Sequence, residues 1–455
     1  MDATTLDTVA QWSGGSLIAG LGSQTIATVC TDSRTLQPGD FFVALRGEKF
    51  DAHDFVQEAA RLGAAAALVE EVAPGLPPDF GVIRVGDTLR GLQALSASYR
   101  RNLRLEVVAI TGSNGKTSTK DLTAAVLSEQ FQVTKTEGNF NNHIGLPLTM
   151  LRARGSDQAG VFEIGMNHPG EIAPLAALAA PNVAIITNIG IAHVEFMGSR
   201  EAIAREKGSL AEALPPSGTV ILSAEDDFSK SIAARTKADA VFAGIGSGDV
   251  QATELQPHAR GTRFKLSAEG RSVDAEIPVP GEHMVRNAVL AAAAGRVFGM
   301  SLEQCAAGIG KLALTKGRLE QKVARGIQIL DDTYNANPDS MSAALRTLAT
   351  LPAEGRRIAV LGAMGELGAE AERGHKSVGE VAAREHIDCV VGVGPQAGWI
   401  VETAERDGVR EVRKVGTAEE ATTLLREFAR PGDVVLIKGS RSAKMERIVE
   451  GMQAP

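Results

Sequence analysis

A glycine-rich segment at residues 109–118 has the residue types that hold the phosphates of a nucleotide. It reads "AITGSNGKTS", follows an apolar run and opens a helical pattern, which is the context of a phosphate loop. Glycines let backbone N–H groups approach phosphate oxygens, and a helix N-terminus adds partial positive charge. Lys116 is expected to reach the β- and γ-phosphates, and the Thr117 hydroxyl to bind Mg²⁺. The candidate nucleotide-binding residues here are Gly112, Ser113, Asn114, Gly115, Lys116, Thr117 and Ser118.

The match is to a short variant of the phosphate loop. The strict pattern has a glycine five residues before Gly115, and this chain has Ile110 there. Taken alone, the remaining pattern Gly-x-x-Gly-Lys-Thr also fits a glycine-rich turn that only caps a helix.

Polar residues follow several other apolar runs. In open α/β sheets, ligands bind outside the carboxyl ends of the strands. Any one group fits a helix cap or a solvated loop, but the same placement after successive strands indicates a shared site. The groups are Glu163, residues 188–193, Asp331 with Asp332, residues 362–368 and residues 438–441.

The apolar runs themselves supply the sheets that position these groups. Short Val- and Ile-rich runs are typical of strands buried on both faces, and amphipathic stretches rich in alanine alternate with several of them, which favours a doubly wound α/β fold. Residues 250–280 instead alternate as antiparallel hairpins do. The predicted strands are 105–110, 160–164, 183–187, 219–223, 240–244, 327–330, 357–361, 388–393 and 433–437, and the predicted helices are 120–130, 288–298, 341–351 and 418–428.

Two joints divide the chain, one at a helical piece around residues 89–100 and one at a polar stretch around residues 314–319. A length of 455 residues suits about three domains. The predicted division is a small N-terminal α/β module at 1–85, a connecting helix at 86–104, a central parallel-sheet domain of P-loop ATPase type at 105–314 and a Rossmann-like α/β domain at 315–455.

Composition excludes several classes of protein. The 47 Lys and Arg residues against 55 Asp and Glu give a net charge of −8, which argues against a nucleic-acid binder. Three cysteines far apart in the sequence form neither a disulfide framework nor a zinc set. No apolar run approaches the length that spans a bilayer, and the N-terminus lacks a signal-peptide pattern. We therefore expect a cytoplasmic protein without membrane insertion.

Six segments carry a resemblance to a known family. They are residues 31–64, 111–118, 137–149, 281–293, 331–345 and 436–446. In this order they resemble the Mur ligases, the ATP-dependent amide-forming enzymes of peptidoglycan synthesis, over nearly the whole chain. The segment "DDTYNANPDSMSAAL" is the most specific, because it separates one member from its sister ligases. Ala363 stands where the family usually has an Asp, so no role is assigned to it.

The resemblance implies the reaction and its participants. The expected activity is that of a peptide ligase that uses ATP and Mg²⁺ to join D-alanyl-D-alanine to UDP-N-acetylmuramoyl-tripeptide through an acyl phosphate. The third peptide residue, diaminopimelate or lysine, stays open. The N-terminal module is expected to bind UDP, and the protein to act as a monomer.

The resemblance also implies a metal site made of Thr117, Glu163, His193 and Lys207. Carboxylate and phosphate oxygens suit Mg²⁺, whereas a histidine ligand is unusual for it, so His193 also fits a hydrogen-bonding residue at a strand end. Lys207 matches the lysine that is carbamylated in the Mur ligases, and a carbamate is an anion that could bind the metal. Without the resemblance it would read as a surface lysine in a charged helix.

Further site residues follow from the resemblance. Arg318 is expected at the γ-phosphate, although an interdomain ion pair would also fit. Asn287 lies one helical turn after His283, where a structural role is equally compatible. The remaining nucleotide-binding candidates are Asp332, Tyr334 and Asn335. The substrate-binding candidates are Ser33, Arg34 and Arg46 for UDP, Lys438 and Arg441 for D-alanyl-D-alanine, and Asn139 and Asn142, which turn chemistry would equally explain.

Three other functions fit parts of this pattern. Folylpolyglutamate synthetase would share the ATP loop and metal site but neither the N-terminal module nor "DDTYNANP". A P-loop switch or motor would hydrolyse nucleotide without an amino-acid substrate, and a nucleotide sensor would need no second metal site.

Overall fold

The structure is a computed structural model that describes residues 1–454, and it forms two compact units. The first unit contains residues 1–109, 131–166 and 172–182. The second contains residues 110–130, 167–171 and the chain from residue 183 onward. Strand β8 (Glu106–Thr111) begins in the first unit and ends in the second.

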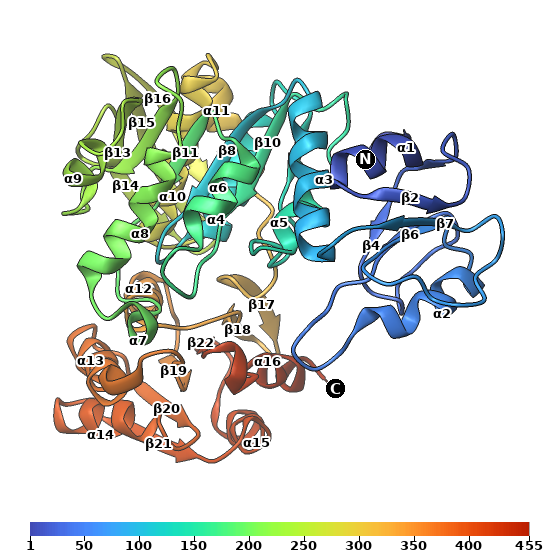
Figure 1. The fold of residues 1–455 in the computed structure, drawn as a ribbon. Helices are drawn as coiled ribbons and strands as arrows, with labels where there is room; N and C mark the ends of the chain where they lie inside the picture. Colours follow the sequence, from blue (N-terminus) through green and yellow to red (C-terminus); the bar gives the residue numbers. More distant parts are fainter. Residues whose placement is uncertain (455) are drawn as a thin grey trace. The chain divides into compact units, whose positions relative to one another are not determined.

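The first unit begins with a five-stranded sheet in the order β2-β7-β6-β5-β4 (Figure 1). Side chains alternate across it, so Phe41 and Val43 pack with α1 and α3 on one face, while Phe42 packs with α2 on the other. A short antiparallel pair, β1 with β3, forms a separate two-stranded sheet. The elements are β1 (Thr4–Thr5), α1 (Leu6–Ser13), β2 (Ser16–Ala19), β3 (Thr25–Ile26), β4 (Val29–Cys30), β5 (Phe41–Val43), α2 (Val56–Arg61), β6 (Ala66–Val69), β7 (Gly81–Arg84) and α3 (Thr88–Asn102).

Helix α3 joins this sheet to the later part of the first unit. Its Tyr99 hydroxyl donates a hydrogen bond to the Ala153 carbonyl at 2.8 Å, and Leu148 and Leu151 pack in the same core. The later elements are β9 (Val133–Lys135), α5 (Gly145–Met150), β10 (Ala159–Glu163) and α6 (Ile172–Ala179), and β9 runs parallel to β10.

The second unit begins with helix α4 (Lys116–Leu127), against which α10 and α11 pack. Strands β11 to β14 are parallel to one another, and β14, β15 and β16 are antiparallel, as the alternation at residues 250–280 predicts. The elements are β11 (Val183–Ile186), α7 (Val194–Met197), α8 (Arg200–Glu212), β12 (Thr219–Ser223), α9 (Ser229–Ala233), β13 (Asp239–Ile245), β14 (Val250–His258), β15 (Gly261–Ala268), β16 (Arg271–Ile277), α10 (Glu282–Val297) and α11 (Leu302–Gly310).

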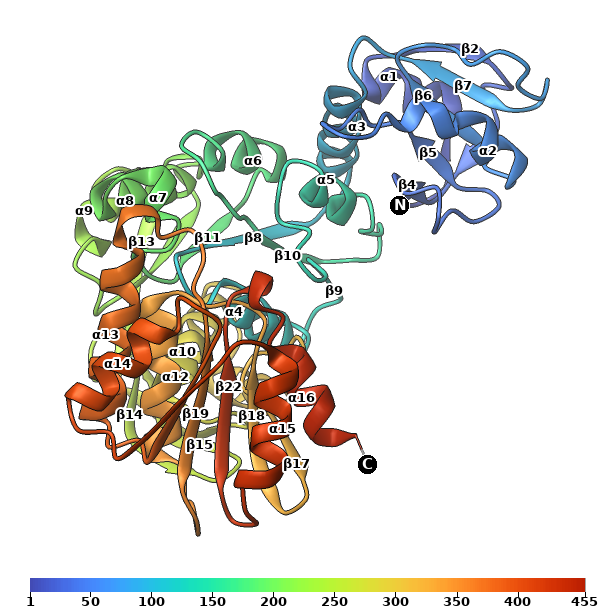
Figure 2. The same ribbon diagram turned by 90° about the horizontal axis from the view of Figure 1, so that it is seen from below.

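The C-terminal part of this unit is a six-stranded sheet in the order β17-β18-β22-β19-β20-β21, in which only β17 is antiparallel to its neighbour. Helices α15 and α16 cover one face of it, and α12 to α14 the other (Figure 2). The elements are β17 (Glu320–Ala324), β18 (Ile327–Asp332), α12 (Pro338–Thr350), β19 (Arg357–Gly362), α13 (Ala371–Arg384), β20 (Cys389–Val393), α14 (Gly398–Arg406), β21 (Glu411–Val415), α15 (Ala418–Phe428), β22 (Val434–Lys438) and α16 (Glu446–Gln453).

The predicted α/β fold with parallel sheets is confirmed, and every predicted strand is present with ends within about two residues. Helix α4 starts four residues before its predicted start because Gly115 adopts a left-handed conformation and caps it. Helix α10 also starts early, at Glu282, so His283 and Asn287 lie on it. Within residues 1–454, no helix combines the length and apolarity that crossing a membrane requires.

Candidate active site

The phosphate loop connects β8 to α4 and makes close contacts that only glycine permits. Gly112 has a φ of +150°, and a Cβ there would lie 1.8 Å from the Thr187 hydroxyl oxygen. A Cβ on Gly115 would lie 2.6 Å from the side-chain oxygen of Asn287. The Lys116 ammonium folds back over the loop and donates a hydrogen bond to the Gly112 carbonyl at 2.7 Å. The loop therefore presents its lysine and the start of α4 together.

The segment after β11, residues 187–193, lies beside this loop and is hydrogen-bonded to it. The Asn188 side chain accepts a hydrogen bond from the Asn114 N–H at 3.0 Å and donates one to the Asn114 carbonyl at 3.1 Å. The Ser113 N–H donates to the Asn188 carbonyl at 2.9 Å, and the Gly190 N–H donates to the Ser113 hydroxyl at 2.9 Å. These bonds fix the backbone of the phosphate loop at two consecutive residues.

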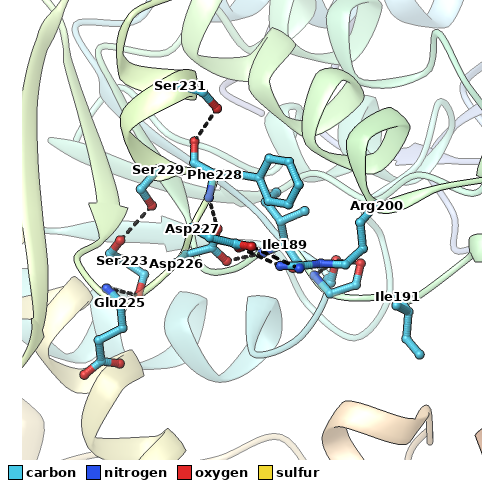
Figure 3. Close-up of polar contacts among 12 residues, drawn as sticks. Ile189, Ile191, Arg200, Ser223, Glu225, Asp226, Asp227, Phe228, Ser229 and Ser231 are labelled. Atoms are coloured by element: carbon cyan, nitrogen blue, oxygen red, sulfur yellow. Dashed lines mark hydrogen bonds and ion pairs between the residues drawn. The ribbon is translucent and has the colours of Figure 1, made fainter.

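The other side of the same segment is held by two charged side chains (Figure 3). Asp226 accepts a hydrogen bond from the Ile189 N–H at 2.7 Å, and Arg200 donates to the Ile189 carbonyl at 2.8 Å. Arg200 also pairs with Asp227 at 2.7 Å and lies over the Phe228 ring. Burial raises the pKa of the Asp226 carboxyl. Both polar groups of Ile189 are thus bound by side chains from outside the segment.

His193 ends this segment in a left-handed backbone conformation, with a φ of 62°. Its Nδ1 atom lies 2.6 Å from a carboxylate oxygen of Glu366, which follows β19 and also has a positive φ, 59°. The neighbouring His193 ring lowers the pKa of the Glu366 carboxyl. Such backbone conformations cost about 1–3 kcal/mol each and are common at functional sites. Residues 362–368 were predicted to border the site, but no role was assigned to Glu366.

Lys207 lies on α8, and only 1% of its surface is exposed. Burial, together with the positive charge of Lys116, holds the pKa of its ammonium group well below the usual value. The interpretation of Lys207 as a surface lysine in a charged helix is therefore wrong, since its side chain is buried.

Arg318 reaches the phosphate loop from the C-terminal part of the second unit. Its guanidinium donates a hydrogen bond to the Thr117 hydroxyl at 2.9 Å and lies 4.2 Å from the centre of the Tyr334 ring. The Lys438 ammonium, buried nearby, pairs with Asp332 at 2.6 Å and donates to the Asn335 carbonyl at 2.9 Å. Six predicted residues, Thr117 among them, thus form one cluster. Arg441 is outside it, exposed and 3.8 Å from Glu446.

Two contacts from the start of α12 were not predicted. The Asn337 side chain caps α12 by accepting a hydrogen bond from the Ser340 N–H, and its amide donates to the Asn114 side chain at 2.7 Å. Asp339 accepts a hydrogen bond from the Ile191 N–H at 3.2 Å. The sequence signal that was available is the capping pattern of "NPDS", which predicts a helix start but no partner.

In the first unit, Glu163 ends β10 and is 2% exposed. One of its carboxylate oxygens accepts a hydrogen bond from the Asn141 side chain at 2.8 Å, and the other is buried with no hydrogen-bond partner among residues 1–454. Asn142 instead accepts hydrogen bonds from the N–H groups of Ile144 and Gly145, at the start of α5. Asn139 lies in the preceding turn, where its carbonyl accepts a hydrogen bond from the Asn141 N–H.

The predicted UDP-binding residues lie in the N-terminal sheet region. Arg46 is held between Asp51 at 2.8 Å and Glu70 at 3.1 Å. Arg34, next to Ser33, is exposed and pairs with Asp32 through two hydrogen bonds, which lower the pKa of the Asp32 carboxyl to about 2. Arg46 is therefore ordered by its partners, whereas Arg34 projects into solvent.

Residues 1–454 contain no group of three or more His, Cys, Asp and Glu side chains arranged to hold a metal. This pattern is compatible with Mg²⁺, which usually keeps several waters and binds one or two carboxylates together with substrate phosphates. The unpartnered buried oxygen of Glu163 has the chemistry of such a ligand.

Three family models match the chain. The Mur ligase middle domain matches residues 110–295, the glutamate ligase domain of the Mur ligases matches residues 317–441, and the catalytic domain of the Mur ligase family matches residues 25–98.

Curated and solved relatives agree with these matches. The UDP-N-acetylmuramoyl-tripeptide–D-alanyl-D-alanine ligase of Bacillus subtilis is 39% identical, with 98% of each chain covered. A crystal structure of MurF from Acinetobacter baumannii has a TM-score of 0.91 at 33% identity and covers 100% of this chain and 99% of its own. MurF from Thermotoga maritima in complex with ADP has a TM-score of 0.83 at 29% identity, with 94% and 97% covered.

Proposed function

The chain belongs to the Mur ligase family, and we propose that it joins D-alanyl-D-alanine to UDP-N-acetylmuramoyl-tripeptide with the consumption of ATP. The observation that carries this proposal is the 39% identity to a ligase of that name over 98% of both chains. It favours this reaction over a folylpolyglutamate synthetase, a nucleotide switch or a sensor, because the N-terminal module and the "DDTYNANP" segment are included in the match.

The reaction requires a leaving group better than oxide. The carboxylate of the tripeptide's last residue attacks the γ-phosphorus of ATP, which gives an acyl phosphate and ADP. The amine of D-alanyl-D-alanine then attacks the acyl carbon, and the tetrahedral intermediate loses a proton and expels inorganic phosphate as the amide forms. Both steps develop negative charge, so cations placed beforehand lower the barrier.

Lys116 and Arg318 are the side chains that supply this charge. Lys116 lies over the phosphate loop, and Arg318 approaches the same loop at Thr117. The backbone N–H groups of Lys116 and Thr117, at the start of α4, add their partial charge. Tyr334 lies beside Arg318, and Asp332 and Asn335 contact Lys438; these three residues would bind the adenosine part of ATP. Asn287 borders the loop at Gly115.

Thr117, Glu163, His193 and Lys207 would hold Mg²⁺. When bound, the ion would neutralise phosphate charge and bring the γ-phosphate and the carboxylate together. Glu163 contributes a buried oxygen for this purpose. Lys207 contributes an anion only as its carbamate, which forms from the neutral amine that burial favours. Glu366 orients the His193 ring through Nδ1.

The substrates would bind at the remaining predicted residues. Ser33, Arg34 and Arg46 are assigned to the UDP group, and Asn139 and Asn142 to the acyl end. Lys438 and Arg441 are assigned to D-alanyl-D-alanine. The four segments 1–85, 86–104, 105–314 and 315–455 correspond to the UDP module, the connecting helix, the ATP-binding domain and the C-terminal domain. The protein is proposed to act as a cytoplasmic monomer.

One assay tests the proposed function. Release of ADP from ATP is measured with UDP-N-acetylmuramoyl-tripeptide, with D-alanyl-D-alanine, with both, and with neither. Sustained turnover only with both substrates, together with formation of the pentapeptide product, is expected. Turnover with neither would indicate a switch or motor, and turnover with a folate and glutamate instead would indicate the sister ligase.

A further inference from the structure

The segment between α11 and β17 is hydrogen-bonded to α4 through Asp121. The proposed function assigns no role to this residue. Asp121, a buried residue of α4, accepts hydrogen bonds through one carboxylate oxygen from the Thr315 N–H at 3.1 Å and from the Thr315 hydroxyl at 2.8 Å. The other carboxylate oxygen lies 3.0 Å from the Lys120 ammonium, which is also buried. Asp121 is thus a charged anchor for Thr315.

This anchor lies one helical turn from the contact that Arg318 makes. Thr117 and Asp121 are four residues apart on α4, so their side chains project from the same face of the helix. Arg318 follows Thr315 by three residues and donates its hydrogen bond to Thr117. The segment therefore lies along α4 with two consecutive attachments, first at Thr315 and then at Arg318.

The residues after Thr315 are fastened to the C-terminal sheet instead. The Gly317 carbonyl accepts a hydrogen bond from the Tyr334 N–H at 3.0 Å. The Leu319 N–H donates to the Asp332 carboxylate at 3.2 Å. Only Lys316, which is exposed, separates these attachments from Thr315, and Gly317 has a φ of +72°. The chain between the two sets of attachments is thus about one residue long.

From this arrangement we infer that Asp121 and Thr315 are positioning residues that deliver Arg318 to the nucleotide site. The inference rests on the proposed function, in which Arg318 acts at the γ-phosphate. With the anchor, Arg318 is tethered by three residues, which span at most about 10 Å. Without it, Arg318 would still be attached to the C-terminal sheet through Gly317 and Leu319, but it would lose the link to α4 that lies three residues before it.

The length of a tether sets the effective concentration of the group that it carries. The three residues from Thr315 to Arg318 keep the guanidinium close to Thr117, so loss of the anchor lowers its effective concentration there. The anchor therefore acts mainly on the interaction of Arg318 with the γ-phosphate. The residues assigned to the adenosine, Asp332 and Tyr334, are bonded to the segment only after Arg318's neighbours Leu319 and Gly317, so the effect on adenosine binding is smaller.

The test compares the affinities for ADP and for a non-hydrolysable ATP analogue by calorimetry. Thr315→Val removes the hydroxyl bond without changing the side-chain shape, whereas replacing Asp121 would leave Lys120 buried without its carboxylate. We expect Thr315→Val to weaken analogue binding about threefold and to weaken ADP binding by clearly less. Thr315→Ser keeps the hydroxyl and should bind both nucleotides as the wild type does. Thr422→Val, which removes a threonine hydroxyl bond on α15, is the matched control.

A double-mutant cycle with Arg318→Ala separates delivery of Arg318 from a purely structural role. If Thr315 acts through Arg318, adding Thr315→Val to Arg318→Ala causes no further loss of analogue affinity. An equal loss in both backgrounds, or an equal loss for ADP and the analogue, overturns the inference. Wild-type analogue affinity in Arg318→Ala would overturn the assignment of Arg318 itself, and with it the role of the anchor.

Discussion

The side-chain amide of Asn337 donates a hydrogen bond to the side-chain oxygen of Asn114 at 2.7 Å, across 223 positions of sequence. The donor stands at the start of α12 and the acceptor in the phosphate loop. Because Asn188 already binds the backbone of Asn114, the loop is held by its backbone from one side and by its side chain from the other. The C-terminal part of the second unit thus takes part in shaping the phosphate loop.

Replacement of Asn337 separates this contact from its capping role. Asn337→Asp keeps an N-cap of similar quality but replaces the donor that faces Asn114 by an acceptor. A neutral hydrogen bond contributes about 0.5–1.5 kcal/mol, so we expect the KM for ATP to rise about threefold to tenfold while the melting temperature changes little. Asn337→Ala should raise the KM for ATP and also lower the melting temperature, because it removes the cap as well as the contact. An unchanged KM in the aspartate variant would show that the contact does not matter for ATP binding.

Lys116→Ala should abolish most turnover and leave the fold intact. The lysine supplies charge where charge develops in the transition state, and such a contribution is worth roughly 2.7–4 kcal/mol, or about 10²–10³ in kcat. Circular dichroism and thermal melting of the variant control for folding. Near-normal turnover by the folded variant would be incompatible with the assignment of the phosphate loop.

Lys207 should carry a carbamate at neutral and mildly alkaline pH. Because burial lowers the pKa of its ammonium group, more of the neutral amine is present there than in an ordinary lysine, and that amine adds to carbon dioxide with release of one proton. Enzyme equilibrated with ¹³C-bicarbonate should show a carbamate carbon signal that disappears as the pH is lowered.

The same signal should be absent from Lys207→Ala, which serves as its control. That variant should lose most activity and regain part of it with acetate, which can supply the missing carboxylate. Wild-type activity in Lys207→Ala would eliminate the carbamate as a metal ligand.

His283 should make stability depend on pH between about 4 and 6.5. Burial lowers the pKa of its ring from 6.5 to about 4. In this window the unfolded chain binds a proton that the folded chain does not, so stability falls as the pH falls through it. The shift corresponds to about 1–3 kcal/mol after allowance for the partial exposure of the ring. Urea denaturation of His283→Gln at pH 7 and pH 5 should show a smaller loss than the wild type, and an equal loss would contradict the assignment.

Arg46→Ala should weaken binding of the UDP-linked substrate without changing the affinity for ADP. Asp51 and Glu70 hold the guanidinium in place, so removing it loses an ordered cation. We expect at least a tenfold rise in the KM for the UDP substrate, since hydrogen bonds to charged groups contribute about 1.5–3 kcal/mol. Arg34→Ala, which removes an exposed and solvated pair, is the comparison and should have the smaller effect.

The strands and the phosphate loop could be predicted because their signals are local. Unbroken runs such as residues 219–223 and 433–437 have the composition of strands buried on both faces. The segment "GSNGKTS" contains within itself the glycines and the lysine that define a phosphate loop. The helix that bears Lys207 was likewise expected from its pattern. The resemblance to the Mur ligases added roles that no local pattern contains.

The partners of the site residues could not be predicted from local sequence. Nothing near Asp121 indicates that it binds Thr315, 194 residues later, and nothing near Glu366 indicates its contact with His193. The left-handed backbone of Glu366 could not be predicted, because glutamate rarely adopts it, and the same conformation at His193 is uncommon for any residue other than glycine. Among the asparagines of "GNFNN", only the structure distinguishes Asn141, which reaches Glu163, from Asn142, which caps a helix.

The three separate stretches that build the first unit fix the order in which a nascent chain can complete it. Asp2 accepts a hydrogen bond from the Gly155 N–H at 2.8 Å, and the Met1 carbonyl accepts one from Arg154. At about 5–20 residues per second, a ribosome needs roughly 8–30 s to reach residue 155 after residue 2. During that interval the face of α3 that receives Leu148 and Leu151 is uncovered. The N-terminal module therefore leaves the ribosome long before its core can close. The apolar face of α3 that is exposed during this time is where a chaperone would be expected to bind.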